Sequence, residues 1–114
     1  MSARRRNRPL LALALVAAAG GAATLPGGVA QAATRTVTLR DIAFHPARVT
    51  IARGDRVVWR WRDGGIRHNV VSRSFRGTGA RSSGSYGVTF RRAGTFRYRC
   101  TLHPGMDGTV VVRR

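Results

Sequence analysis

The chain has 114 residues, with 21 arginines, no lysine and four aspartates, and its formal net charge is +17. This length allows one domain with one hydrophobic core, and the single cysteine excludes a disulfide within the chain. So strong a positive charge favours acidic partners or anionic polymers and lipids, although an arginine-only basic composition is equally consistent with a compositional bias of the source.

The first 32 residues have the features of a secretory signal peptide. Four arginines at positions 4, 5, 6 and 8 precede an apolar run over residues 10–19, and Ala30-Gln31-Ala32 offers a small-residue cleavage site. We expect cleavage after Ala32 and export to the periplasm or the extracellular side of the envelope. Glycines and a proline follow the apolar run, which argues against a membrane anchor. The arginine cluster leaves Sec and twin-arginine export both open.

Residues 33–114 are expected to form one all-β domain, in which 17 arginines against four aspartates leave a net charge of +13. Apolar and polar residues alternate between turn signals, which predicts about seven short strands and no helix. Many short strands with regular turns favour a β-sandwich with Greek-key connections. The predicted strands are 34–39, 49–51, 56–61, 68–71, 86–90, 95–100 and 109–113.

Two tryptophans and two irregular segments complete this prediction. Trp59 and Trp61 share a strand face with Val57, so they are expected in the core, in preference to stacking nucleic-acid bases between the neighbouring arginines. Residues 44–47 contain a proline and are predicted to interrupt the strands. Residues 73–85 are rich in Gly, Ser and Arg and are predicted to be a long surface connection.

The most informative segment is Cys100-Thr-Leu-His103-Pro-Gly-Met106, which places a thiol, an imidazole and a thioether within seven residues. Copper proteins that transfer electrons bind the metal through two imidazoles and a thiolate, with a weak axial thioether. His68 is the candidate for the second imidazole. Cys100 ends a predicted strand, and Gly105 and Gly108 are expected to let the following loop turn back sharply.

Each of these residues also has an ordinary structural interpretation. A lone cysteine is most simply a small buried apolar residue, Met106 a core residue, and His68 an uncharged sheet residue. Only their combination favours copper over structural zinc, which usually takes four Cys or His ligands. Asn69 is expected to hydrogen-bond across to the Cys100 loop, or else to be a polar edge residue. His45 is expected on the surface, with an auxiliary metal role as the alternative.

At these residues the chain resembles the cupredoxins, and among them the small plastocyanin- and amicyanin-like electron carriers. The Cys-x2-His-x2-Met spacing is particularly similar to amicyanin, whereas the basic Arg60-Trp61-Arg62 departs from the family. The resemblance implies a Greek-key sandwich with one type 1 copper ion held by His68, Cys100, His103 and Met106. It also implies that electrons pass at the edge of the His103 ring, through an apolar surface patch. The matching residues are Phe44-x-Pro46, Val49-Thr50-Ile51, Gly54-Asp55-Arg56-Val57-Val58-Trp59, Asp63, His68-Asn69-Val70, Gly94-Thr95-Phe96-x-Tyr98-x-Cys100, His103-Pro104-Gly105-Met106 and Gly108-Thr109-Val110.

The function expected from the sequence is that of an exported, monomeric one-electron carrier that is not an enzyme. Its partners would be redox proteins with acidic docking surfaces, and its arginines would favour association with the anionic envelope. A copper-binding or copper-delivery module is the main alternative. A nucleophile enzyme using Cys100 and His103 has only Asn69 to orient the histidine. Export opposes nucleic-acid binding, and His45 alone cannot build a second copper centre.

Overall fold

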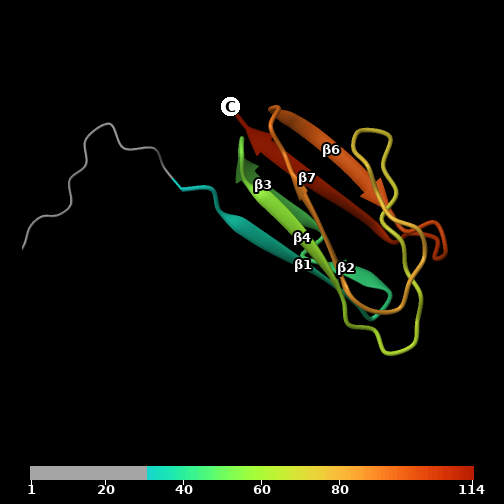
Figure 1. Ribbon diagram of the computed structural model, residues 1–114. Coiled ribbons are helices and arrows are strands. Elements are labelled where there is room, and N and C mark those ends of the chain that lie inside the picture. The colour runs from blue at the N-terminus through green and yellow to red at the C-terminus, as the bar shows by residue number, and fades with distance from the viewer. Residues whose placement is uncertain (1–30) are drawn as a thin grey trace, which may run out of the picture. The chain divides into compact units, whose positions relative to one another are not determined.

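The computed structural model describes residues 31–114, which build two β-sheets and contain no helix (Figure 1). One sheet has the strand order β2-β1-β4-β5 and the other has the order β3-β7-β6. The predicted all-β class is therefore confirmed. The strands are β1 (Thr34–Arg40), β2 (Ala43–His45), β3 (Arg48–Ala52), β4 (Arg56–Trp61), β5 (Ser85–Thr89), β6 (Gly94–Arg99) and β7 (Asp107–Arg113).

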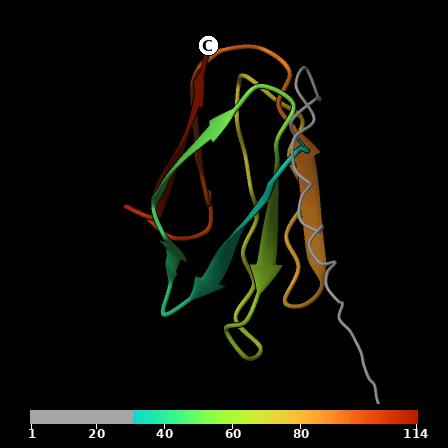
Figure 2. The ribbon, with the colours of Figure 1, turned by 90° about the vertical axis from the view of Figure 1, so that its left-hand side faces the viewer.

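The chain crosses repeatedly between the two sheets. β1 pairs in parallel with β4, and β3 pairs in parallel with β7, while the remaining ladders are antiparallel. Parallel neighbours cannot be joined by a hairpin, so each pair needs a crossover connection. Figure 2 shows the outcome, with β3 and β7 in one layer and β1, β4 and β5 in the other.

Both layers contribute their inward side chains to one core. Trp59 and Trp61 are buried, as their shared strand face predicts, and the ring of Phe75 stacks on Trp59 at 5.6 Å. Phe75 lies in the connection between β4 and β5, so part of that predicted surface segment packs against the core. The core residues are Val37, Leu39, Phe44, Val49, Ile51, Val57, Trp59, Trp61, Val70, Phe90, Phe96, Tyr98, Cys100, Met106, Val110 and Val112.

Two strand predictions differ from the structure. Residues 68–71 form no strand but make two isolated bridges, from His68 to Arg81 and from Val71 to Arg99. The predicted interruption at residues 44–47 is only partly correct, because Ala43–His45 form β2. The turn before β2 holds Asp41 and Ile42 at φ angles of 53° and 51°. Hairpin turns of this kind usually carry Asn or Gly, so the sequence lacks the usual signal for this one.

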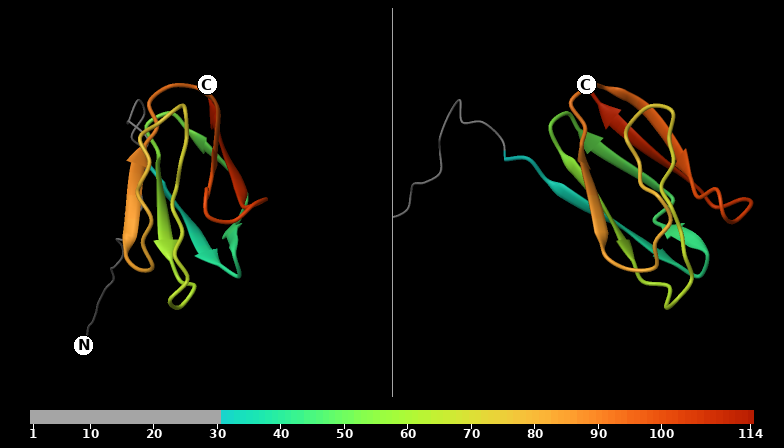
Figure 3. Two further views of the ribbon diagram at one scale, coloured as in Figure 1. Left: turned by 90° about the vertical axis from the view of Figure 1, so that its right-hand side faces the viewer. Right: turned by 45° about the vertical axis from the view of Figure 1, so that its right-hand side comes forward.

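Long connections bring distant segments together at one end of the sandwich. Residues 62–84 run beside β6, where the backbone of Val71 exchanges hydrogen bonds with that of Arg99 (Figure 3). The turn between β1 and β2, the start of this connection and the loop after β6 meet through the side-chain contacts described below. These contacts define the metal centre.

The expected signal peptide, residues 1–32, lies outside the described residues except for its last two positions. Residues 31–114 contain no helix with the length and apolar character that a membrane crossing requires.

Candidate metal centre

Three predicted ligands come together at this end of the sandwich. One nitrogen of His68, the sulfur of Cys100 and one nitrogen of His103 all lie within 4.8 Å of one another. Nδ1 of His68 is 3.8 Å from Sγ of Cys100, and the two imidazole rings have centroids 4.8 Å apart at an angle of 62°. His68 and Cys100 are buried, whereas His103 is partly exposed.

Cys100 is positioned by the sheet and by a closed loop. It follows the last residue of β6, and its backbone N–H donates to the carbonyl of Met106 at 2.9 Å. The N–H of Met106 in turn donates to the carbonyl of His103 at 3.2 Å, and the Met106 side chain is buried. Two backbone hydrogen bonds therefore link the three residues that carry the sulfur, the imidazole and the thioether.

The two loop glycines have different functions. Gly105 adopts a φ of 85°, which other residues avoid, so its role in the sharp turn is as predicted. Gly108 instead belongs to β7, where an added Cβ would come within 2.2 Å of the Tyr98 ring. It is needed because the aromatic ring packs directly on the backbone, and the expectation that it folds the ligand loop is wrong.

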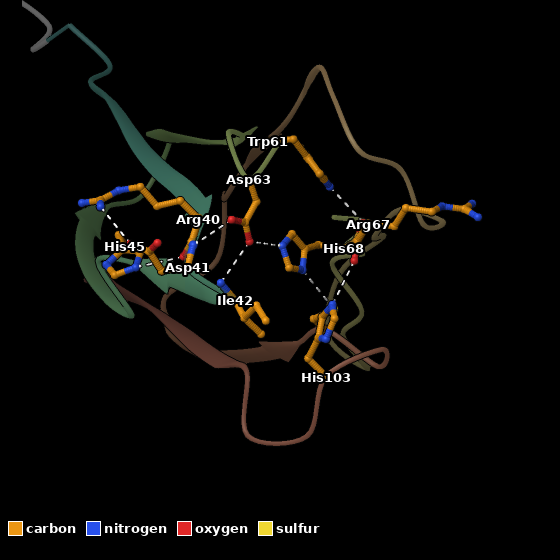
Figure 4. A network of polar contacts seen from close by, with 10 residues as sticks. Arg40, Asp41, Ile42, His45, Trp61, Asp63, Arg67, His68 and His103 are labelled. Carbon is orange, nitrogen blue, oxygen red and sulfur yellow. Dashed lines mark hydrogen bonds and ion pairs between the residues drawn. The ribbon is translucent and has the colours of Figure 1, made fainter. Parts of the chain in front are cut away.

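His68 is oriented by a carboxylate on the far side of its ring. Nε2 of His68 lies 2.7 Å from Oδ2 of Asp63, and both side chains are shielded from solvent (Figure 4). A proton on Nε2 can donate to this carboxylate, which leaves the Nδ1 lone pair directed toward the Cys100 side. Such carboxylate–histidine contacts fix the tautomer and ring orientation of metal-binding histidines.

Asp63 also holds the turn between β1 and β2. Its carboxylate accepts hydrogen bonds from the backbone N–H groups of Asp41 and Ile42, each at 3.0 Å. The bond from Ile42 is the main cause that lowers the pKa of Asp63; partial burial opposes it, and the contacts with His68 and Asp41 lower it further. The left-handed backbone is unfavourable for a β-branched residue such as Ile42, so this carboxylate stabilises a strained turn as well as a ligand.

Further contacts fix the backbone around His68. The indole Nε1 of Trp61 donates to the carbonyl of His68 at 2.9 Å, and His68 exchanges two backbone hydrogen bonds with Arg81. The guanidinium of Arg81 lies over the Trp61 ring at 4.9 Å. The sequence predicts Trp61 as core, but it gives no sign that this side chain supports a ligand.

Asn69 joins the two ligand-bearing segments. Its amide group donates to Oγ1 of Thr101 at 2.8 Å, and its oxygen accepts from the N–H of Thr101, also at 2.8 Å. These two hydrogen bonds are the contact that the sequence predicts between Asn69 and the Cys100 loop. They couple the residue after His68 to the residue after Cys100.

His103 lies at the surface side of the cluster. Its Nε2 is 3.1 Å from the carbonyl of Arg67, an arrangement that leaves Nδ1 on the inner side. Leu102, next to His103 in the sequence, and Ile66, two residues before His68, are solvent-accessible, with exposed fractions of 46% and 40%. Each of the two histidine segments therefore carries one apolar surface residue.

The residues fit a type 1 copper ion. Two imidazoles, each with its outer nitrogen hydrogen-bonded, and one buried free cysteine form the His2Cys donor set. Within residues 31–114, no other set of three His, Cys, Asp or Glu side chains comes close enough to hold a metal. His45 is not part of the cluster, since its Nε2 donates to the carbonyl of Arg40 at 3.1 Å.

The chain is similar to known copper proteins. No protein-family model matches the chain. It is 33% identical over 118 aligned positions to amicyanin-alpha of Methylorubrum extorquens, with 92% of this chain and 98% of that protein covered. A reduced Cu(I) form of an amicyanin mutant superposes with a TM-score of 0.63 at 31% identity, over 76% of this chain and 88% of that one. A purple cupredoxin from Nitrosopumilus maritimus, 19% identical, has the same fold with a TM-score of 0.62, over 68% of this chain and 98% of that one.

A two-sheet sandwich with a His-Cys-His cluster at one end, together with these neighbours, defines a cupredoxin, a type 1 copper protein. The cofactor is one copper ion, and the protein is a small copper protein of the electron-carrier type. Within this class, the chain belongs to the amicyanin family, because it matches amicyanin-alpha over nearly the full length of both proteins.

Proposed function

We propose that this protein is an exported one-electron carrier whose copper is held by His68, Cys100, His103 and Met106. The observation that supports this best is the convergence of the two imidazoles and the thiol within 4.8 Å, from segments far apart in the sequence. Met106 would complete the set as a thioether donor, since it is buried and its carbonyl accepts a hydrogen bond from the N–H of Cys100.

The bound copper supplies a one-electron redox couple. The chain contributes hydrogen bonds that hold the donor side chains in place. Asp63 fixes the ring of His68, Arg67 fixes the ring of His103, and Asn69 ties their segments together. Donors held in this way move little when the charge at their centre changes, which keeps the reorganisation needed for electron transfer small.

The same residues argue for a carrier in preference to an enzyme. His68 and Cys100 are buried, so a dissolved substrate does not reach these two donors. His103 is the ligand with an exposed part, and both histidine segments carry an exposed apolar side chain, Leu102 beside His103 and Ile66 two residues before His68. We assign the passage of electrons to this edge, where a partner can exclude water on docking.

The N-terminal segment completes the proposal. Its arginines, apolar run and Ala30-Gln31-Ala32 support export with cleavage after Ala32, leaving residues 33–114 as a monomeric domain. An oxidising compartment and a single cysteine are compatible, because the thiol is occupied by the metal and cannot pair within the chain.

The test is an optical spectrum and a voltammogram of the exported protein after addition of Cu(II). We expect one copper per chain, an intense visible band from the thiolate, and a reversible one-electron wave. Copper binding without a reversible wave would favour the delivery module instead. Mass spectrometry of the same sample reports the cleavage site.

A further inference from the structure

An open groove on the flank of the sandwich has no part in the metal centre. It is lined by residues 71–74, by residues of β6 and by the first residues of β7. Its volume is about 670 Å³. A water molecule takes up about 30 Å³, so the groove has room for a chain segment and is much larger than one carboxylate or phosphate needs.

The lining of this groove is strongly cationic. Arg73, Arg97 and Arg99 line it, and the only acidic lining residue is Asp107. Within residues 31–114, none of these three guanidinium groups forms an ion pair or a side-chain hydrogen bond, since the ion pairs are Arg40–Asp41 and His68–Asp63. Their hydrogen-bond donors are free for a ligand.

We infer that this groove is the docking site for an extended acidic segment of a redox partner protein. The inference rests on the proposed carrier function, because a carrier must dock with partners. Guanidinium groups recognise carboxylates through paired, charge-assisted hydrogen bonds. The hydroxyl groups of Ser74 and Thr109 add neutral donors along the same groove.

The spacing of the arginines favours an extended peptide. Arg97 and Arg99 lie two residues apart on one face of β6, which places them about 7 Å apart along the strand. Every second side chain of an extended peptide has the same repeat. A flat lipid surface has no such repeat along the strand.

The groove also adjoins the metal centre. Arg99 directly precedes Cys100, and Asp107 directly follows Met106. A partner segment in the groove would therefore lie against the backbone on both sides of the ligand loop, near the copper but away from the exposed edge of His103. The groove would hold the partner while that edge stays available.

The test is a binding titration with a short fluorescent peptide that carries aspartate at every second position, followed by anisotropy at low salt. The groove variant is Arg73→Ser/Arg97→Ser/Arg99→Ser. The matched control is Arg53→Ser/Arg60→Ser/Arg91→Ser, which removes the same charge from exposed positions elsewhere. The single variants Arg97→Ser and Arg60→Ser, both at exposed strand positions, serve if a triple variant fails to fold.

We expect the groove variant to bind the peptide about tenfold more weakly, which corresponds to three modest ion pairs, and the control to change little. Equal losses in both variants would overturn the inference in favour of net charge alone. Full competition by an equal concentration of inorganic phosphate would overturn it in favour of a small-anion site. Groove-dependent binding to phosphatidylglycerol vesicles, without peptide binding, would overturn it in favour of a membrane. The visible copper band is recorded for every variant, so failure of the carrier function is scored separately.

Discussion

The two segments that carry the proposed ligands are held in contrasting ways. Cys100, His103 and Met106 lie in a short loop between two paired strands, β6 and β7, and backbone hydrogen bonds close this loop on itself. His68 lies in a long connection without a strand of its own. Its position depends on side-chain hydrogen bonds of Asp63, Trp61 and Asn69.

The loop after β6 is therefore held by its own backbone hydrogen bonds, whereas the His68 segment is held by side-chain contacts. Loss of one contact in the loop leaves the sheet to hold the remaining residues. Loss of one side-chain support at His68 releases an imidazole whose backbone is held by an isolated bridge to Arg81 and by the indole of Trp61, and not by a strand. The following changes test this contrast, from the largest expected effect to the smallest.

Replacement of the thiol gives the largest effect. In Cys100→Ala the intense visible band of the copper-loaded protein is expected to disappear, because the thiolate that gives rise to it is gone. The sandwich should remain folded, as circular dichroism can show, since β6 and β7 are paired without the sulfur. A blue spectrum in this variant would contradict the assigned ligand set.

Removal of the carboxylate behind His68 is expected to come second. In Asp63→Ala the ring nitrogen Nε2 loses its acceptor, and the turn N–H groups of Asp41 and Ile42 lose theirs. Supporting contacts of this kind typically contribute about 10- to 100-fold to metal affinity, so a loss of that size is expected in a competition titration with a chelator. Asp63→Asn keeps an acceptor oxygen and should lose less. Equal affinity in all three proteins would show that the backbone alone places His68.

The thioether is expected to affect the potential more than the binding. In Met106→Leu the protein should still bind copper, since the other three ligands remain, but its reduction potential should rise. Loss of axial donation destabilises the oxidised ion more than the reduced one. Voltammetry of the two proteins side by side measures this, and an equal or lower potential would argue against an axial role for Met106.

The link between the two segments is expected to have a smaller effect. Asn69→Ala removes both hydrogen bonds to Thr101, and the free energy of unfolding should fall by about 1 kcal/mol because these groups are partly solvated. Denaturant titration measures this loss. Ser72→Ala, which removes one hydrogen bond to the backbone of Arg97, is a control away from the ligands.

Asp55 lies in the turn between β3 and β4, and its replacement is expected to change how the stability of the fold depends on pH. Backbone hydrogen bonds from Ala33 and then Ala52 lower the pKa of Asp55 below its usual 3.8. A lowered pKa means that the ionised carboxylate stabilises the fold at neutral pH and loses this effect as the pH falls below about 4. Asp55→Asn should therefore melt earlier at pH 7 and show a shallower loss of melting temperature on acidification. Identical acid profiles would contradict this role.

The same contrast explains what the sequence can predict. The Cys100–Met106 loop can be predicted as a metal-binding loop because its three donors lie within seven residues. Strand β6 can be predicted because Phe96 and Tyr98 alternate with polar residues. His68 can be proposed only as the missing imidazole. Nothing in its own surroundings predicts bridges in place of a strand, because isolated bridges leave no periodic pattern.

Asp63 shows the limit most clearly. The sequence places it at the end of a strand before two glycines, which indicates a turn and nothing more. Its role depends on the turn at Asp41 and Ile42, which lies far away in the chain and lacks the usual Asn or Gly. Contacts between segments that are distant in the sequence leave no local sequence pattern. For this reason neither β2 nor the role of Asp63 is predicted.

The position of Arg67 has a mechanical consequence. The carbonyl of Arg67 accepts a hydrogen bond from Nε2 of His103, and the next residue in the chain is His68. The backbone at residues 67 and 68 therefore positions both imidazole rings. When thermal motion displaces this stretch, the two rings travel in concert, so the distance between them varies less than the position of either one.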